Sequence, residues 1–470
     1  MNLSIVDLIV IAVYFLVVIL IGFFSYKLSS RHKNKKTEFL LAGRQLTLPL
    51  FVATLVATWY GLILGVGEFV YSQGVVDWVC MGLPYYCAAT LFGVFIAGKV
   101  RKSTAETIPE QVSMRYGPVA GRIASILVLI ITIPAAYILM LGVLLQMITG
   151  MGLPLCIILG TLSSVLYLFT GGFRADVTTN ALQFFLMYIG FGVLLIFAIL
   201  KYGSISTMAA ALPESHLSFM GGNSWQVIVT WFIISLQTFI DPSFHQRSAA
   251  AKTPTVAKKG ILISVLFWIL FDFLTITSGL YARVHLKIDP IMAFPALGEQ
   301  ILPVFWKGVF VVSLLATVMS TLNSYSFISG MTIGNDIISK IFKKQRTTEY
   351  YTRIGLGIAS VIGIFMAILL PSAVQLIYKT ASIAVPGLLI PLLTSFSKER
   401  ILSRVAAICI MVASSLLSGI WTLLSAFTII PGVFQVYLLS IEPMIPGIVL
   451  SAVLFGIFAV YNRVGNTKVV

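Results

Sequence analysis

Apolar runs, each long enough to cross a lipid bilayer, recur along the whole 470-residue chain. A helix needs about 20 apolar residues to span the hydrocarbon core of a membrane. The chain is 59% hydrophobic and only 10% charged, whereas soluble domains carry about 25% charged residues. The runs leave no room for a soluble domain between them. They predict an all-α polytopic membrane protein embedded in the lipid bilayer.

We expect about thirteen transmembrane helices from the positions of these runs. The predicted spans cover residues 5–26, 47–72, 75–98, 120–147, 153–170, 178–200, 224–245, 258–283, 306–334, 352–371, 373–397, 403–427 and 443–462. The four cysteines (Cys80, Cys87, Cys156 and Cys409) all fall within these spans. Such cysteines predict no disulfide framework.

The basic residues predict the orientation of the chain in a cell inner or plasma membrane. Most of the 31 Lys and Arg residues fall on one side of the predicted spans, and an excess of such residues marks cytoplasmic loops. We therefore predict that the N-terminus lies outside and the C-terminus in the cytoplasm. The net charge of +15 is then a consequence of topology, and no nucleic acid partner is expected.

Residues 317–326 (TVMSTLNSYS) place hydroxyl and amide groups inside an apolar span. The i, i+3, i+4 spacing puts the hydroxyls of Thr317, Ser320 and Thr321 on one helical face. Uncharged oxygens gathered inside hydrocarbon suit a small hard cation. The same groups could instead bond to their own helix or help helices to pack closely. The run alone leaves both interpretations open.

Two of the predicted spans are interrupted. The second contains Gly61 and then Gly65 and Gly67, and the seventh contains the pair Asp241-Pro242. Discontinuous membrane helices free backbone carbonyls that can coordinate an ion. The two spans are five apart, which fits a pair of five-helix repeats with a transport site between them. The competing explanation is that Gly and Pro are common in membrane helices.

Ionisable residues inside membrane spans are expensive to bury and are candidates for function. Asp272 falls near the middle of the eighth span, where it serves function or packs as a buried carboxylate. Glu68 and Lys379 fall nearer the outer side and could pair with each other or touch a substrate. Asp241 lies near the inner end of its span, where it could simply cap a helix.

Five segments resemble the sodium:solute symporter family, whose members transport sugars, proline, pantothenate, sialic acid and iodide. They are residues 39–46 (FLLAGRQL), 108–117 (IPEQ and RYG), 171–183 (GGFRADVTTNALQ), 246–252 (QRSAAAK) and 319–324 (MSTLNS). Each is weak alone, but all five occur in order between the right spans. The resemblance implies a leucine-transporter-like fold built on inverted five-helix repeats. It divides the chain into an extra N-terminal helix (1–46), two repeats (47–202 and 203–398) and two C-terminal helices (399–470).

The resemblance also implies sodium as the coupling ion. In the family, one sodium lies between the broken first core helix and the eighth core helix. By motif, its ligands in this chain are the backbone carbonyls of Ala57, Tyr60 and Thr317 and the hydroxyls of Ser320 and Thr321.

One departure from the family pattern concerns a second sodium. Many members carry an aspartate at the position of Asn180, and in some it supports that second ion. Here an acid stands one turn earlier, at Asp176. It is either a relocated carboxylate or, as we expect, a residue near the inner start of its helix, favoured by the helix dipole. We therefore predict one sodium per transport cycle.

Together these features predict sodium-coupled secondary active uptake of a small organic solute by a monomer that works by alternating access. Asp272 favours amino or hydroxyl groups and Lys379 favours a carboxylate, so a sugar, sugar acid, amino acid or vitamin stays possible. The alternatives are a proton-coupled or sodium-independent exchanger that titrates Asp272 or Glu68, and an uncoupled channel or sensor. An enzyme is disfavoured, because no Ser/His/Asp or paired-carboxylate arrangement is present. The expected solute-lining residues are Trp59, Tyr60, Leu62, Glu68, Gln237, Ser243, Asp272 and Lys379.

Overall fold

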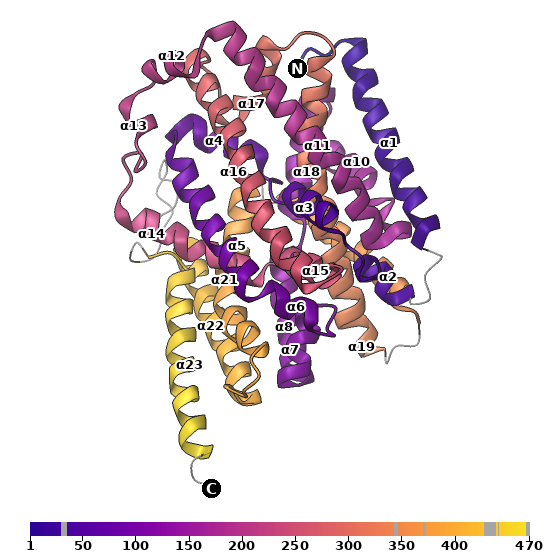
Figure 1. The fold of residues 1–470 in the computed structure, drawn as a ribbon, viewed down its shortest axis with the longest axis vertical. Coiled ribbons are helices and arrows are strands. Elements are labelled where there is room, and N and C mark those ends of the chain that lie inside the picture. The colour runs from indigo at the N-terminus through magenta and orange to yellow at the C-terminus, as the bar shows by residue number, and fades with distance from the viewer. Residues whose placement is uncertain (30–34, 343–345, 370–372, 427–438, 440, 467–470) are drawn as a thin grey trace.

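The computed structural model describes residues 1–29, 35–342, 346–369, 373–426, 439 and 441–466, and this part of the chain is helical and free of strands (Figure 1). Ten of its helices are long and apolar enough to cross a membrane, and three shorter apolar helices accompany them. Every predicted span overlaps one helix or a series of shorter helical segments. The all-α membrane architecture is therefore confirmed, while the count of thirteen spans stays a prediction. The last residues of the tenth and twelfth predicted spans, residues 370–371 and 427, lie outside the described residues.

The N-terminal segments are α1 (Ile5–Ser29), α2 (Lys35–Leu41), η1 (Ala42–Arg44), α3 (Leu48–Ala57), α4 (Ile63–Gln73), η2 (Trp78–Gly82), α5 (Leu83–Phe95), α6 (Ala97–Lys102), α7 (Ile108–Tyr116), α8 (Pro118–Thr132), α9 (Ala135–Thr149), α10 (Leu153–Val165) and α11 (Leu168–Tyr202). The central segments are α12 (Ile205–Ala210), α13 (Glu214–Leu217), α14 (Trp225–Ile234), η3 (Ser235–Ile240), α15 (Pro242–Ala250), α16 (Pro254–His285), η4 (Pro290–Met292) and α17 (Ala293–Ile301). The C-terminal segments are α18 (Trp306–Met331), η5 (Thr332–Ile338), α19 (Ser339–Ile341), α20 (Thr348–Leu369), α21 (Ala373–Ser395), α22 (Arg404–Ala426) and α23 (Met444–Asn466).

The predicted interruptions of the second and seventh spans are confirmed. The second span divides into α3 and α4, with residues 58–62 between them. The seventh passes from α14 through the 3₁₀ turn η3 to α15, whose N-cap is Asp241. A third break, between α8 and α9 at Pro134, was not predicted. Proline lacks the backbone N–H that would continue the helix.

The hydropathy predicts that the sixth span begins at residue 178. In the structure α11 begins earlier, at Leu168. Gly172 kinks it with φ 57° and ψ −148°, a conformation that costs other residues free energy. Asp176 lies one turn beyond this kink and is fully buried. Asp176 therefore lies in the first turn of the helical segment that follows the kink, as expected, while its location on the inner side stays a prediction.

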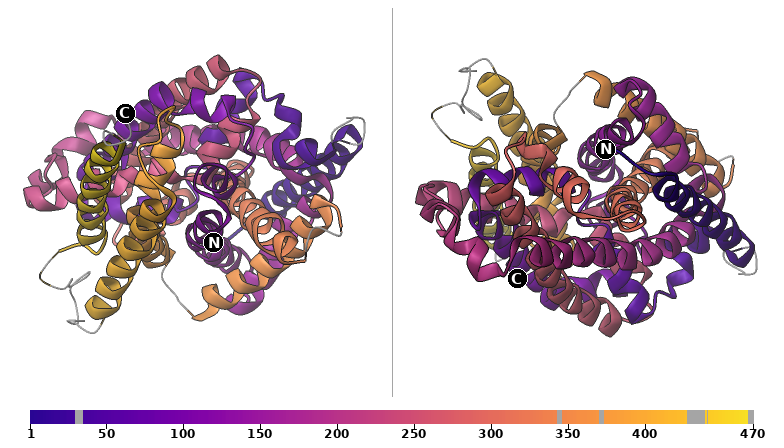
Figure 2. Two further views of the ribbon diagram at one scale, coloured as in Figure 1. Left: turned by 90° about the horizontal axis from the view of Figure 1, so that it is seen from below. Right: turned by 90° about the horizontal axis from the view of Figure 1, so that it is seen from above.

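Helix α18 is the most enclosed of the long helices, because 94% of the residues in its apolar stretch are buried inside the protein. It packs against α11, α1, α20 and α9. Figure 2 shows α1 and α23 at opposite edges of the molecule. The polar run that the sequence placed on α18 is thus surrounded by other helices and shielded from lipid.

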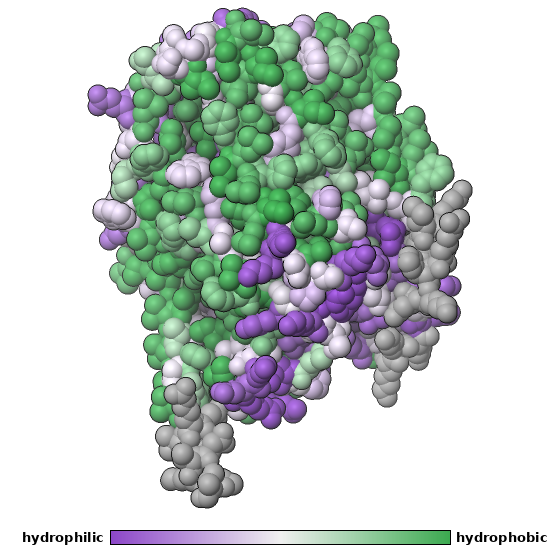
Figure 3. Space-filling view, in the orientation of Figure 1, coloured by the Kyte–Doolittle hydropathy of each residue, from purple (hydrophilic) through white to green (hydrophobic). Residues whose placement is uncertain are grey.

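Hydrophilic residues gather at one end of the molecule. Figure 3 shows a hydrophobic surface over most of this face and hydrophilic side chains low on the right, where Figure 1 places α2, α6 and α7. Helix α6 ends in Lys99, Arg101 and Lys102. The basic loops therefore share one end, as the topology predicts, and its cytoplasmic location stays a prediction.

That end is held together by ion pairs and backbone contacts. Lys36 Nζ lies 2.5 Å from a Glu106 carboxylate oxygen. Burial lowers the pKa of Lys36, but the hydrogen bond and charge of Glu106 outweigh it and the pKa is raised. Arg44 donates a hydrogen bond of 2.9 Å to the Ser103 carbonyl, and Leu46 N donates one of 3.0 Å to the carbonyl of Ala250 at the end of α15. These contacts join residues 36–46 to the segment that follows α6 and to the end of α15.

We expect Gly172→Ala to lower the apparent melting temperature of the purified protein. An added Cβ would lie 2.7 Å from the Phe39 carbonyl oxygen, and the backbone conformation alone should cost about 1–3 kcal/mol. Gly192→Ala is the matched control, because a Cβ at this position of the same helix meets nothing within 4 Å. Equal melting temperatures for the two variants would contradict the assigned kink.

Candidate functional site

The break between α3 and α4 lies directly against α18. A Cβ added at Gly61 would lie 2.6 Å from the Cβ of Thr321 and equally close to Tyr137. Only glycine fits this approach without displacing its neighbours. The break therefore brings the unpaired carbonyls at the end of α3 to the hydroxyl face of α18.

Two α18 hydroxyls reach these carbonyls. Ser320 Oγ lies 2.6 Å from the Ala57 carbonyl oxygen and 2.9 Å from that of Thr317. Thr321 Oγ1 donates to the Thr58 carbonyl at 2.9 Å. The oxygens of Ala57, Thr317, Ser320 and Thr321 thus converge between two helices, and none is charged. Such a donor set fits a small hard cation.

Tyr60, the fifth expected ligand, lies in the same break. Its side-chain hydroxyl donates to Asp272 Oδ1 at 2.7 Å and to the Trp268 carbonyl at 3.1 Å. The Tyr60 side chain therefore ties the break to α16, while the role of its backbone carbonyl as a ligand stays a prediction.

A second polar cluster lies at the level of Asp176. The guanidinium of Arg247 is 3.5 Å from the Asp176 carboxylate, and both side chains are fully buried. Arg247 also donates to Thr58 Oγ1 at 2.6 Å and to Ser324 Oγ at 2.8 Å. Ser324 in turn donates to Asp176 at 2.8 Å, and the Asn180 amide donates to Asp176 at 3.2 Å.

A cavity of about 150 Å³ lies beside the break. Residues 58–60 and Leu62 of the break form one wall, and Gln237, Asp241 and Asp272 contribute polar groups. The other described lining residues are Val66, Asp77, Met81, Tyr85, Tyr137, Trp231, Ile234, Tyr325 and Ala381. The site therefore combines aromatic walls with a few polar groups, which is typical of small-molecule sites.

The structure brings together five of the expected solute-lining residues, namely Trp59, Tyr60, Leu62, Gln237 and Asp272, around this cavity. Glu68, Ser243 and Lys379 are not among the described lining residues. Lys379 is exposed. Ser243 follows Pro242 in the first turn of α15, where its backbone N–H donates to Asp241 at 2.7 Å, so Asp241 caps this helix as well as lining the cavity.

Several site residues escaped the sequence reasoning. Arg247 was assigned to a basic loop, but α15 continues past residue 245 and buries it. Asp77 falls inside the predicted span 75–98, and a carboxylate inside a membrane span is a sign of a functional residue. Tyr85, Tyr137 and Tyr325 carry no pattern that separates lining from packing.

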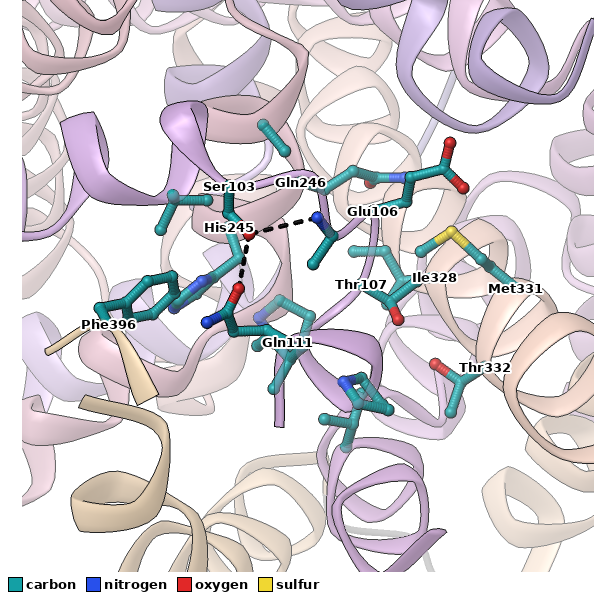
Figure 4. A pocket seen from close by; sticks show the side chains of 17 residues that line it. Ser103, Glu106, Thr107, Gln111, His245, Gln246, Ile328, Met331, Thr332 and Phe396 are labelled. Atoms are coloured by element: carbon teal, nitrogen blue, oxygen red, sulfur yellow. Dashed lines mark hydrogen bonds between the residues drawn. The ribbon is translucent and has the colours of Figure 1, made fainter. Parts of the chain in front are cut away.

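A second, much smaller cavity lies beyond α15. Its volume is about 30 Å³, and its lining includes Glu106, Gln111 and His245 (Figure 4). Asp241 and Tyr325 line the larger cavity, whereas Pro242 and Ile328, which follow further along the same segments, line the smaller one. The hydrogen bond of 2.7 Å from Tyr325 to Asp241 lies between them.

Breaking the buried ion pair should destabilise the protein. Asp176→Asn leaves the Arg247 charge uncompensated, and loss of one partner of such a pair typically costs about 3–5 kcal/mol. The double variant Asp176→Asn/Arg247→Met removes both charges, and we expect it to melt at a higher temperature than either single variant. Additive losses in the double variant would show that the two charges do not stabilise each other.

The chain matches a known protein family. The sodium:solute symporter family matches residues 39–409. The high-affinity choline transporter 1 of Drosophila melanogaster is 24% identical over 78% of this chain and 63% of its own length. The rabbit (Oryctolagus cuniculus) sodium/glucose cotransporter 1 is 25% identical over 77% of this chain and 62% of its own. The chain thus spans less than two thirds of the length of these relatives.

Solved structures share the fold. A sodium-coupled sialic acid symporter in a substrate-bound outward-open state superposes with a TM-score of 0.81 over 97% of this chain and 99% of its own, at 13% identity. The nucleobase-cation-symport-1 family transporter Mhp1 gives 0.60 over 91% of this chain and 94% of its own, at 14% identity. With the family matching residues 39–409, the chain belongs to the sodium:solute symporter family.

Proposed function

We propose that the protein takes up a small organic solute by alternating access, driven by the inward flow of sodium. The observation that carries the proposal is the convergence of Ala57, Thr317, Ser320 and Thr321 oxygens between the broken helix and α18. The relatives are named for choline and glucose, so membership of the family leaves the solute open. A single chain carries the whole site, which supports a functional monomer.

Sodium would act by joining two parts of the molecule. Its proposed ligands are the carbonyls of Ala57, Tyr60 and Thr317 and the hydroxyls of Ser320 and Thr321. The ion can shift the balance between outward- and inward-facing states only by binding them with different affinity. We propose that it favours the outward-facing state, because it holds the break against α18. By linkage, the solute should then raise the affinity for sodium by the same factor.

Removing either hydroxyl ligand should weaken sodium binding. We expect Ser320→Ala and Thr321→Ala each to raise the sodium concentration for half-maximal uptake roughly ten-fold, as for a loss of about 1.4 kcal/mol. Uptake of radiolabelled solutes into proteoliposomes at varied sodium would measure it. Ser326→Ala is the matched control, because this α18 hydroxyl is buried but has no hydrogen-bond partner among the described residues. Unchanged sodium dependence in both test variants would reject the site.

We further propose one sodium per cycle. The position where many relatives carry an acid holds Asn180, whose amide donates hydrogen bonds to Thr54, Asp176 and Ser324. The Arg247 guanidinium already supplies a fixed positive charge to this cluster. A sodium placed there would be repelled by that charge in a medium that screens poorly.

Equilibrium binding of radioactive sodium to the purified protein tests this stoichiometry. We expect one ion per protein and a Hill coefficient near one, and we expect Thr321→Ala to weaken that single site. Two ions per protein in the wild type, with one retained in Thr321→Ala, would overturn the proposal. Counting bound ions avoids any assumption about the charge of the solute.

A further inference from the structure

The larger cavity is strongly acidic. Three carboxylates line it, from Asp77, Asp241 and Asp272, and none of its described lining residues is Lys, Arg or His. All three side chains are at least nine-tenths buried, with exposed fractions of 3%, 4% and 9%. Burying an uncompensated carboxylate is costly, so each of these groups calls for a partner.

Two of the three carboxylates have partners within the protein. Asp272 accepts hydrogen bonds from the hydroxyls of Tyr60 and Tyr86. Asp241 accepts one from the Tyr325 hydroxyl and one from the Ser243 backbone N–H, each 2.7 Å long. These two side chains are therefore fixed in place as parts of the wall.

Asp77 differs from them. Its Oδ1 is buried, and no group in the described part of the chain donates a hydrogen bond to it. It occupies the N-cap position of η2 but makes no capping bond there. A buried acceptor without a donor is destabilising, and Asp77 is one of the residues that line the cavity. Asp77 therefore needs a donor that the described protein does not supply.

Asp241 interacts electrostatically with Arg247, but no described lining residue supplies a positive charge to Asp77. Arg247 lies beyond Thr58, and its guanidinium is paired with Asp176. Lys379 is exposed and is not among the described lining residues. The other prominent lining groups are aromatic, with the rings of Trp59, Tyr85 and Trp231 among them. Such rings attract cations through their faces.

From this arrangement, and resting on the proposed transport function, we propose that the solute is a small protonated amine whose N–H groups donate to Asp77 while aromatic side chains surround its body. The volume of about 150 Å³ corresponds to roughly ten waters, so the solute is small. A carboxylate would enter beside three acids, and a neutral polyol would leave the charge of Asp77 unmatched. A quaternary ammonium carries the charge but has no N–H for the Asp77 oxygen.

Matched compounds test the solute class. Calorimetric binding to the purified protein in sodium would compare ethanolamine, ethylene glycol and glycolate, then 4-aminobutanol, 1,4-butanediol and 4-hydroxybutyrate, then benzylamine, benzyl alcohol and benzoate. We expect an amine to bind about ten-fold or more tightly than its alcohol and acid partners, as for one charge-assisted hydrogen bond. Choline, the quaternary relative of ethanolamine, should bind more weakly than an amine that binds. A panel in which no amine binds, or in which choline, alcohols or acids bind best, overturns the proposal.

Asp77→Asn tests the contact itself. We expect it to weaken binding of the best amine about ten-fold, while radioactive sodium binding stays intact and shows that the protein is folded. Glu214→Gln, an exposed carboxamide replacement in α13, is the control and should bind the amine as the wild type does. Amine affinity within two-fold of wild type in Asp77→Asn would overturn the assignment.

The outcome can be separated from that of the transport proposal. Sodium-driven uptake of a neutral sugar would overturn the amine assignment and leave the symport proposal standing. Binding and uptake of an amine that is indifferent to sodium would support the amine assignment and overturn sodium coupling.

Discussion

The rest of the site depends on backbone carbonyls that a broken helix exposes inside a membrane. Hydrocarbon offers no water to such groups, and each one left unsatisfied costs several kcal/mol. In this protein α3 stops at Ala57, and α18 supplies hydroxyls to the carbonyls that are released. A cation could take over the same oxygens. The break is thus a structural weakness that, in the proposed function, serves as a binding site.

The same short segment serves the cavity. Ala57 contributes its carbonyl to the proposed ion site, while residues 58–60 and Leu62 form a cavity wall. Tyr60 connects this wall to Asp272 on α16, and Gly61 allows the segment to lie against Thr321. An ion that fixes the break would also fix the wall that a solute meets. This shared segment offers a physical route for coupling between ion and solute.

Much of this arrangement could be predicted from the sequence, because membrane burial leaves a simple signature. The apolar runs gave the spans, the glycines around residue 61 gave the break, and the spacing of Ser320 and Thr321 gave the hydroxyl face. Each depends on local sequence and on the absence of water. The division into 1–46, 47–202, 203–398 and 399–470 stays a prediction.

Other features depend on contacts between distant segments and left no local pattern. Arg247 reads as a loop residue, and only its approach to Asp176 and Thr58 makes its burial tolerable. The extension of α11 around Gly172 runs through polar residues that hydropathy excludes. The missing partner of Asp77 became visible only when its neighbours were in place.

The most direct test of the proposed sodium site is a pair of cryo-electron microscopy structures of the protein, one in sodium and one in potassium. We expect a density feature, present only in sodium, between the carbonyls of Ala57 and Thr317 and the hydroxyls of Ser320 and Thr321. The hydrogen bond between Ser320 and the Ala57 carbonyl should be replaced by contacts to the ion. An unchanged hydrogen bond in sodium, with ion density only beside Asp176 or nowhere in the membrane region, would contradict it.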